Sequence, residues 1–84
     1  MKIEKSSQRG MTTVRLSGHF QAEHIAEVNK QLQDNGPRVV LDLTEVTVVD
    51  VEVVRFFGAC EANGVKVVHC PRYIREWISR ERET

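Results

Sequence analysis

The sequence is poor in several residue types that mark specialised proteins. Its 84 residues include two cysteines and two prolines, and aromatic residues make up only 6% of the chain. The two cysteines form no C-x-x-C pair, and their neighbours supply no metal-ligand spacing. We therefore expect Cys60 and Cys70 to be reduced thiols, with Cys60 packed as a small apolar residue.

Charge of one sign and long apolar runs are also missing. Lys plus Arg and Asp plus Glu each number 12, so the chain has no excess charge to attract nucleic acid or an anionic membrane. No apolar stretch is long enough to span a bilayer, and residues 1–5 lack the apolar run of a signal peptide. We expect a cytoplasmic protein that binds no nucleic acid and does not insert into a membrane.

Motifs for catalysis or cofactor binding are absent as well. The sequence contains no Gly-rich phosphate loop, no GxSxG and no HExxH. His19, His24 and His69 are not spaced as metal ligands, and Asp42 falls within a predicted strand without a positioned partner. The sequence therefore predicts no catalytic residue, no cofactor and no metal, and we expect that the protein is not an enzyme.

The composition that remains is that of a small globular domain. Hydrophobic residues make up 40% of the chain and charged residues 29%, which argues against disorder. The length allows one domain, residues 1–84, with one modest core.

The first half of the chain predicts a hairpin followed by a helix. Residues 2–8 and 11–17 read as two strands, with Gly18 ending the second. A helix over 21–35 is predicted, with Gly36-Pro37 as its stop. Its apolar positions recur at helical spacing: Ala22, Ile25, Val28 and Leu32.

The next part of the chain predicts a buried strand and a crossover helix. Residues 38–43 read as a strand buried on both faces, and a second apolar run leads to Asp50. A helix over 51–63 begins at Asp50 as its cap and buries Val53, Phe57 and Cys60, with Val54 at the edge of that face.

A last strand and a last helix complete the chain. Residues 65–69 predict the strand, and a helix begins at Pro71, with Trp77 as its main apolar anchor and a frayed tail over 79–84. The order gives an α/β fold, a small mixed sheet in which a β-hairpin is followed by α-β-α-β-α. We expect 38–43 to be the central strand, between the hairpin and 65–69.

Three segments in order resemble the STAS domain, the fold of bacterial anti-sigma factor antagonists. They are VRLSGHFQA at 14–22, RVVLDLTEVTVVD at 38–50, and GVKVV at 64–68 followed by PRYIREWI at 71–78. The middle segment is the most specific, because it resembles the central strand, the short loop and the aspartate before the regulatory site. The resemblance implies a STAS-like fold and binding of a protein partner.

The sequence departs from the family at the regulatory motif. The family has Asp, Ser or Thr, Ser, Gly and Leu, and its first hydroxyl residue is phosphorylated by a partner kinase. Here the line is Asp50-Val51-Glu52-Val53-Val54, so the phosphoacceptor position holds Val51. We expect no phosphorylation there. Thr44 and Thr47 lie nearby but precede the aspartate, and we do not expect them to replace the lost site.

The outer face of the predicted helix over 51–63 is the candidate partner-binding surface. This face is mostly small or apolar, with Gly58 beside it, whereas a solvated helix face normally carries more charge. The alternative is a helix that is simply weakly polar on its outside. The partner-binding residues in this hypothesis are Asp50, Val51, Glu52, Arg55, Ala59 and Ala62.

Two protein-binding functions and one alternative class follow. The first is an interaction module of the anti-sigma factor antagonist type, whose partner is an anti-sigma factor kinase or a regulatory complex. The second is a small accessory STAS subunit of a larger complex such as a lipid-transport system. The third, a small enzyme or ligand-binding domain, needs a pocket with convergent polar groups, which the sequence does not indicate. A homo-oligomer is compatible with all three.

Overall fold

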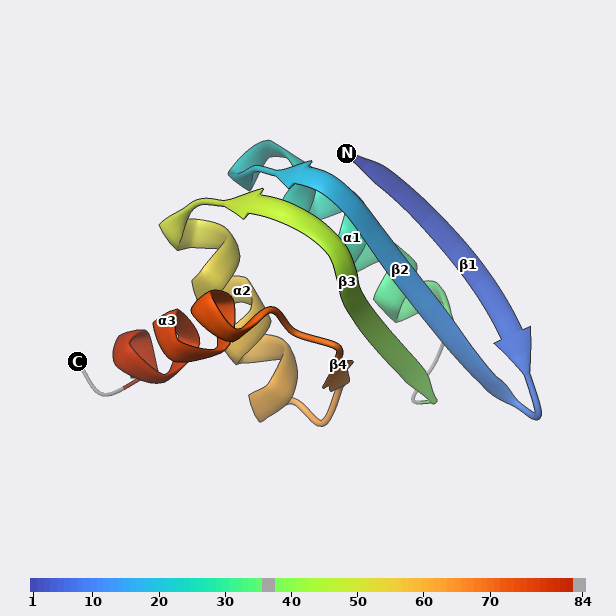
Figure 1. The fold of residues 1–84 in the computed structure, drawn as a ribbon. Coiled ribbons are helices and arrows are strands. Elements are labelled where there is room, and N and C mark those ends of the chain that lie inside the picture. The colour runs from blue at the N-terminus through green and yellow to red at the C-terminus, as the bar shows by residue number, and fades with distance from the viewer. Residues whose placement is uncertain (36–37, 83–84) are drawn as a thin grey trace.

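The computed structural model describes residues 1–35 and 38–82 as a four-stranded mixed sheet with helices packed against it (Figure 1). This confirms the predicted fold class. The predicted helix stop at Gly36-Pro37 lies outside the described residues. The elements in chain order are β1 (Lys2–Gln8), β2 (Met11–Phe20), the 3-10 helix η1 (Ala22–His24), α1 (Ile25–Asp34), β3 (Val39–Val49), α2 (Val51–Ala62), β4 (Lys66–Val68) and α3 (Arg72–Arg82).

The sheet has the order β1-β2-β3-β4, which confirms that β3 lies inside it, between the hairpin and β4. β1 pairs with β2 antiparallel, and the other two pairings are parallel. Along β2, Val14 and Leu16 are fully buried while Arg15 between them is exposed, so the strand has one buried and one exposed side. These side chains form one core with those of α1 and α2.

The core side of α2 is as predicted, with one addition. Val53, Phe57 and Cys60 are buried, and Val54, predicted at the edge of that face, is fully buried too. The Phe57 ring packs edge-on against Phe20 from the end of β2, with 5.6 Å between the ring centroids. The aromatic pair joins α2 to the end of the second strand.

Both long strands run further than predicted. Gly18 does not end β2 but takes a φ of 86° at a shift in the β2–β3 register, and the strand continues to Phe20. Glycine adopts this conformation without the strain a side chain would cause, so the strand passes through the irregularity. β3 likewise continues past Leu43 to Val49 and includes the second apolar run. As a result Phe20 pairs with Val49, and both strands end side by side.

The last helix differs from the prediction in two respects. Trp77 is only partly buried, whereas Ile74 and Ile78 are 0% and 1% exposed and are the anchors of α3. The prediction of a frayed tail from Ser79 onward is wrong for residues 79–82. These residues belong to α3, which ends at Arg82. An ion pair between Glu81 and α2 holds this last turn in place.

Candidate functional site

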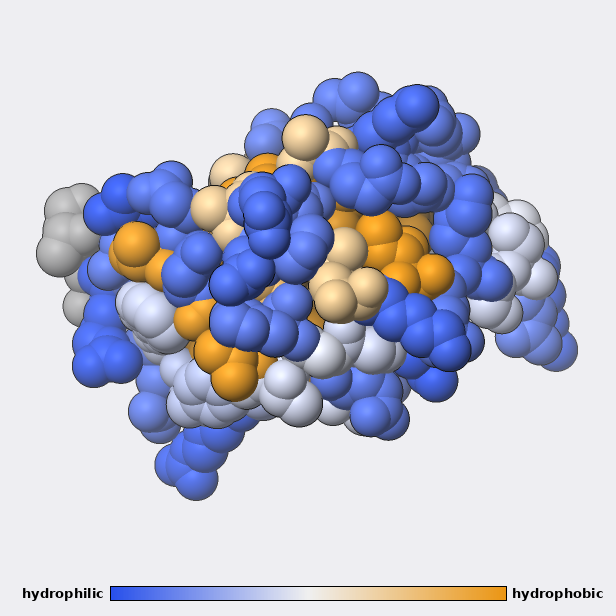
Figure 2. Space-filling view, turned by 90° about the horizontal axis from the view of Figure 1, so that it is seen from above, coloured by the Kyte–Doolittle hydropathy of each residue, from blue (hydrophilic) through white to orange (hydrophobic). Residues whose placement is uncertain are grey.

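The candidate site lies where β2 and β3 end and where η1 and α2 begin. We call this the strand-end face and define it by residues 47–52 and Tyr73. Figure 2 looks down on this end of the molecule and shows apolar atoms exposed among hydrophilic ones. Val48 is 50% exposed and Tyr73 47%, and Val51 beside them is half-buried. The Tyr73 hydroxyl donates to the Thr47 carbonyl oxygen at 2.6 Å, which brings its ring beside the end of β3.

Asp50 holds the starts of two helical segments at this face. Its Oδ1 accepts a hydrogen bond from the Val53 backbone N–H at 3.0 Å, which confirms the predicted cap of α2. Its Oδ2 accepts from the Ala22 backbone N–H, also at 3.0 Å. The second bond was not predicted, because it joins residues that are distant in the sequence and has no local signal.

The hydrogen bonds to Asp50 also keep it charged. The bond from the Val53 N–H is the main reason that the pKa of Asp50 lies below its ordinary value of 3.8, and the bond from Ala22 acts in the same direction. A carboxylate at a helix N-terminus is further favoured by the helix dipole. Asp50 is therefore an ionised structural residue that also borders the exposed apolar side chains.

The start of η1 is held from a second side. His24 Nδ1 accepts a hydrogen bond from the Gln21 backbone N–H at 3.0 Å. This ring nitrogen is therefore satisfied by the backbone of the residue three positions earlier. Together with Asp50, the bond holds the loop from β2 into η1 in one conformation.

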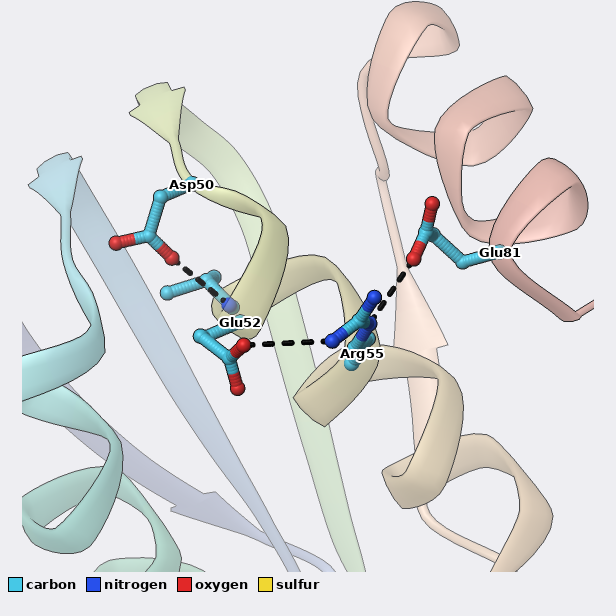
Figure 3. A network of polar contacts seen from close by, with 5 residues as sticks. Asp50, Glu52, Arg55 and Glu81 are labelled. Atoms are coloured by element: carbon cyan, nitrogen blue, oxygen red, sulfur yellow. Dashed lines mark hydrogen bonds and ion pairs between the residues drawn. The ribbon is translucent and has the colours of Figure 1, made fainter.

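Arg55 lies on the outer side of α2 as predicted, but its guanidinium group is paired with two carboxylates. Its Nε lies 2.9 Å from Glu81 Oε1 on α3, and its Nη1 lies 3.4 Å from Glu52 Oε1 on α2 (Figure 3). The Arg55 and Glu52 side chains remain 60% and 59% exposed. A partner at this surface would therefore meet an ion-pair network and not a single cation.

The second half of the outer face of α2 is partly covered by α3. Gly58 is buried, and a Cβ built there would lie 3.7 Å from Ile78 Cγ2 and 3.8 Å from the Arg82 side chain. Gly58, which the sequence places beside the outer face, is therefore covered by α3, and its small size serves that packing. Ala59 and Ala62 are exposed as predicted. The strand-end face thus brings together Asp50, Val51 and Glu52, with Arg55 next to it.

A second polar cluster, which the sequence did not reveal, surrounds Asp42. This side chain is buried, and its Oδ1 accepts a 2.9 Å hydrogen bond from the Thr44 backbone N–H. Its Oδ2 lies 3.6 Å from Arg15 Nε and 3.4 Å from His69 Nδ1. Burial raises the pKa of Asp42, but the Thr44 hydrogen bonds and His69 outweigh it and lower the pKa below 3.8. The cluster joins three separate segments of the chain. For this reason no spacing of residues within a short stretch of sequence indicates it.

Residues 1–35 and 38–82 contain neither a metal-binding cluster nor a membrane-spanning helix. No group of three or more His, Cys, Asp or Glu side chains in these residues is arranged to hold a metal ion. Over the same ranges, no helix has the length and apolar character needed to cross a membrane.

Comparison with known proteins identifies the family. A family model described as "Mlab, STAS domain" matches residues 3–69, which is most of the chain. The chain belongs to the STAS domain family. A search of curated proteins gives no match.

A solved structure described as "Crystal Structure Analysis of Mglu" supports the fold. It aligns with a TM-score of 0.65 at 23% sequence identity. The match covers 82% of this chain but only 19% of that protein, so it supports the STAS fold and not a shared activity.

Proposed function

We propose that this STAS domain is a protein-interaction module that binds its partner through the strand-end face and has no catalytic activity of its own. The observation that carries the proposal is the exposure of Val48 and Tyr73, with the half-buried Val51, around a helix start that Asp50 holds in place. Exposed apolar side chains that are rimmed by polar ones are typical of protein-binding surfaces. The rim here is formed by Asp50, Glu52 and Arg55.

The module works without a phosphorylation switch at the family position. Val51 has no oxygen to phosphorylate, and it contributes apolar contact area instead. Thr44 is a poor replacement, because its hydroxyl already donates to the Asp42 carboxylate. A phosphate at that oxygen would face this carboxylate and would be repelled by it.

Two partner systems fit this surface. In the first, the domain is an anti-sigma factor antagonist that binds a kinase-like anti-sigma factor or another regulatory complex. In the second, it is an accessory subunit of a larger assembly, such as a lipid-transport system. The description of the matching family, "Mlab, STAS domain", is compatible with both systems. Neither system requires a catalytic residue on this chain.

The test is affinity capture from the native organism, followed by titration of the recovered partner. Val51→Asp and Val48→Asp place a charge in the apolar centre of the strand-end face, and we expect each to weaken binding at least tenfold. Met11→Asp is the matched control, because Met11 is an exposed apolar residue at the start of β2, the opposite end of that strand from this face. Equal affinity for all three variants would rule out the strand-end face as the interface.

A further inference from the structure

A groove with a volume of about 650 Å³ lies between α1 and α2. It is distinct from the strand-end face and does not depend on the proposed function. Three amide side chains line it: Asn29, Gln33 and Asn63. Its apolar lining comes from α1, β3, α2 and the loop before β4. It includes Ile25, Leu32, Val39, Phe56, Cys60 and Val65.

The groove is uncharged, although 29% of the chain is charged. None of the residues that line it is Lys, Arg, Asp, Glu or His. The only titratable group is the Cys60 thiol, and burial raises its pKa to about 11, so it stays neutral at physiological pH. An ionic group placed there would lose water and gain no counter-charge, which is costly. The body of any occupant must therefore be uncharged.

Two of the amides have unused hydrogen-bonding capacity. Asn29 and Gln33 are exposed at the rim of the groove, and their side chains make no hydrogen bond to any described residue, whereas Asn63 Nδ2 donates to the Ala59 carbonyl oxygen at 2.8 Å. Both free amides come from α1, so they lie along one side of the groove. They can donate to or accept from a single polar group at one end of an occupant.

The dimensions favour a small molecule over a protein. Pockets for small ligands measure roughly 300–1,000 Å³ and combine an apolar lining with a few polar groups that fix orientation. A stable protein interface buries about 800 Å² on each partner, more than a single groove of this size offers. We propose that the groove between α1 and α2 binds a neutral, mostly apolar small molecule with one hydrogen-bonding end, held at that end by Asn29 and Gln33.

The experiment titrates the full chain with N-phenyl-1-naphthylamine, a neutral apolar fluorophore with one N–H group. We expect a saturable rise in fluorescence with one site per chain. Backbone amide NMR shifts should change in α1 and in the second half of α2, and not in β1.

The deciding variant is Asn29→Asp combined with Gln33→Glu, which keeps side-chain size and adds two negative charges to the groove. We expect the dissociation constant to rise at least tenfold. The control is Lys30→Glu, which changes the net charge equally at an exposed position of α1 outside the lining. It should bind as the unaltered chain does, and thermal unfolding checks that both variants fold.

Three results would overturn the proposal. The first is the absence of saturable binding by the folded chain. The second is equal binding by the double variant and the control, which would place the probe elsewhere. The third is a dimer in sedimentation that the double variant dissociates, which would show that a second copy of the chain occupies the groove.

Discussion

Helix α2 has two neighbouring helices, and the two contacts are built differently. Towards α3, Gly58 is buried against Ile78, and ion pairs of 2.9 Å and 2.7 Å close the contact at Arg55–Glu81 and Glu61–Arg75. Towards α1, an uncharged groove remains open. One side of α2 is thus completed within the chain, while the other leaves apolar surface and free amides available.

The difference shows how one helix serves both stability and binding. A small residue at position 58 leaves room for Ile78 and Arg82 of α3 to pack over α2, and charged pairs at the edge then fix the position of α3. The groove has neither a buried glycine contact nor an ion pair across it, so nothing in the described chain brings α1 closer to α2 there. If this account holds, the α2–α3 contact is structural, and changes at the two ends of α2 affect the protein independently of each other.

The largest effect is expected from Ile78→Ala at the α2–α3 contact. Ile78 is 1% exposed, so its truncation should cost about 2–5 kcal/mol of unfolding free energy. Trp77→Ala is the comparison and should cost less, because Trp77 is only partly buried. Urea unfolding measures both, and an equal or larger loss for Trp77→Ala would contradict the assignment of the anchors.

A smaller loss is expected when Asp50 is removed. Asp50→Ala deletes the cap of α2 and the bond to Ala22, so the unfolding free energy should fall by about 1–3 kcal/mol. Asp34→Ala, at the opposite end of α1, is the control and should be near neutral. If the two variants unfold alike, Asp50 does not hold the two helix starts together.

Acid should reduce stability through the same carboxylate and through Asp42. Both pKa values are lowered in the folded state, so both groups stabilise the fold when ionised. Their contribution is present above the ordinary pKa of 3.8 and is lost as pH falls below it through the folded values. Urea unfolding from pH 6 to pH 2 should show this decline. Replacing both residues by Asn should flatten it, and an unchanged pH profile would refute the assignment.

The smallest effect should come from Gly58→Ala, and its sign is informative. The added Cβ would meet Ile78 at 3.7 Å, an ordinary contact, while the helix interior gains up to about 1 kcal/mol from replacing Gly with Ala. We expect unchanged or slightly raised thermal stability, whereas Gly58→Leu should displace α3 and lower it. Destabilisation by both would mean that α3 packs more tightly than described.

Local patterns were enough to predict the order of elements. The Asp50 cap, the apolar runs and the period of α2 all lie within short stretches of sequence, and each was found where expected. The prediction that Gly18 ends the strand was wrong, because a glycine that ends a strand and a glycine that lets a strand bend look the same in the local sequence. The prediction that Trp77 is the main anchor was wrong, because the size of a side chain alone does not decide which side of a helix faces the core.

The other features that escaped prediction are long-range. The Asp50–Ala22 bond and the contacts of Asp42 with Arg15 and His69 join segments that only the fold brings together. The groove between α1 and α2 is similar, since its lining is spread over residues 25–65. In the candidate site, the residues of one short segment, Asp50 to Arg55, were therefore foreseen, while Val48 and Tyr73 were not.

The most direct test of the central claim is photo-cross-linking in cells of the native organism. A benzophenone amino acid placed at Val51 or Val48 reports what touches the strand-end face, and the same group at Met11, at the opposite end of β2, serves as the control. We predict that both strand-end positions form a cross-linked adduct of one defined mass with another protein and that Met11 does not. Adducts at Met11 alone, or none at Val51 and Val48, would contradict the claim that this domain binds its partner through the strand-end face.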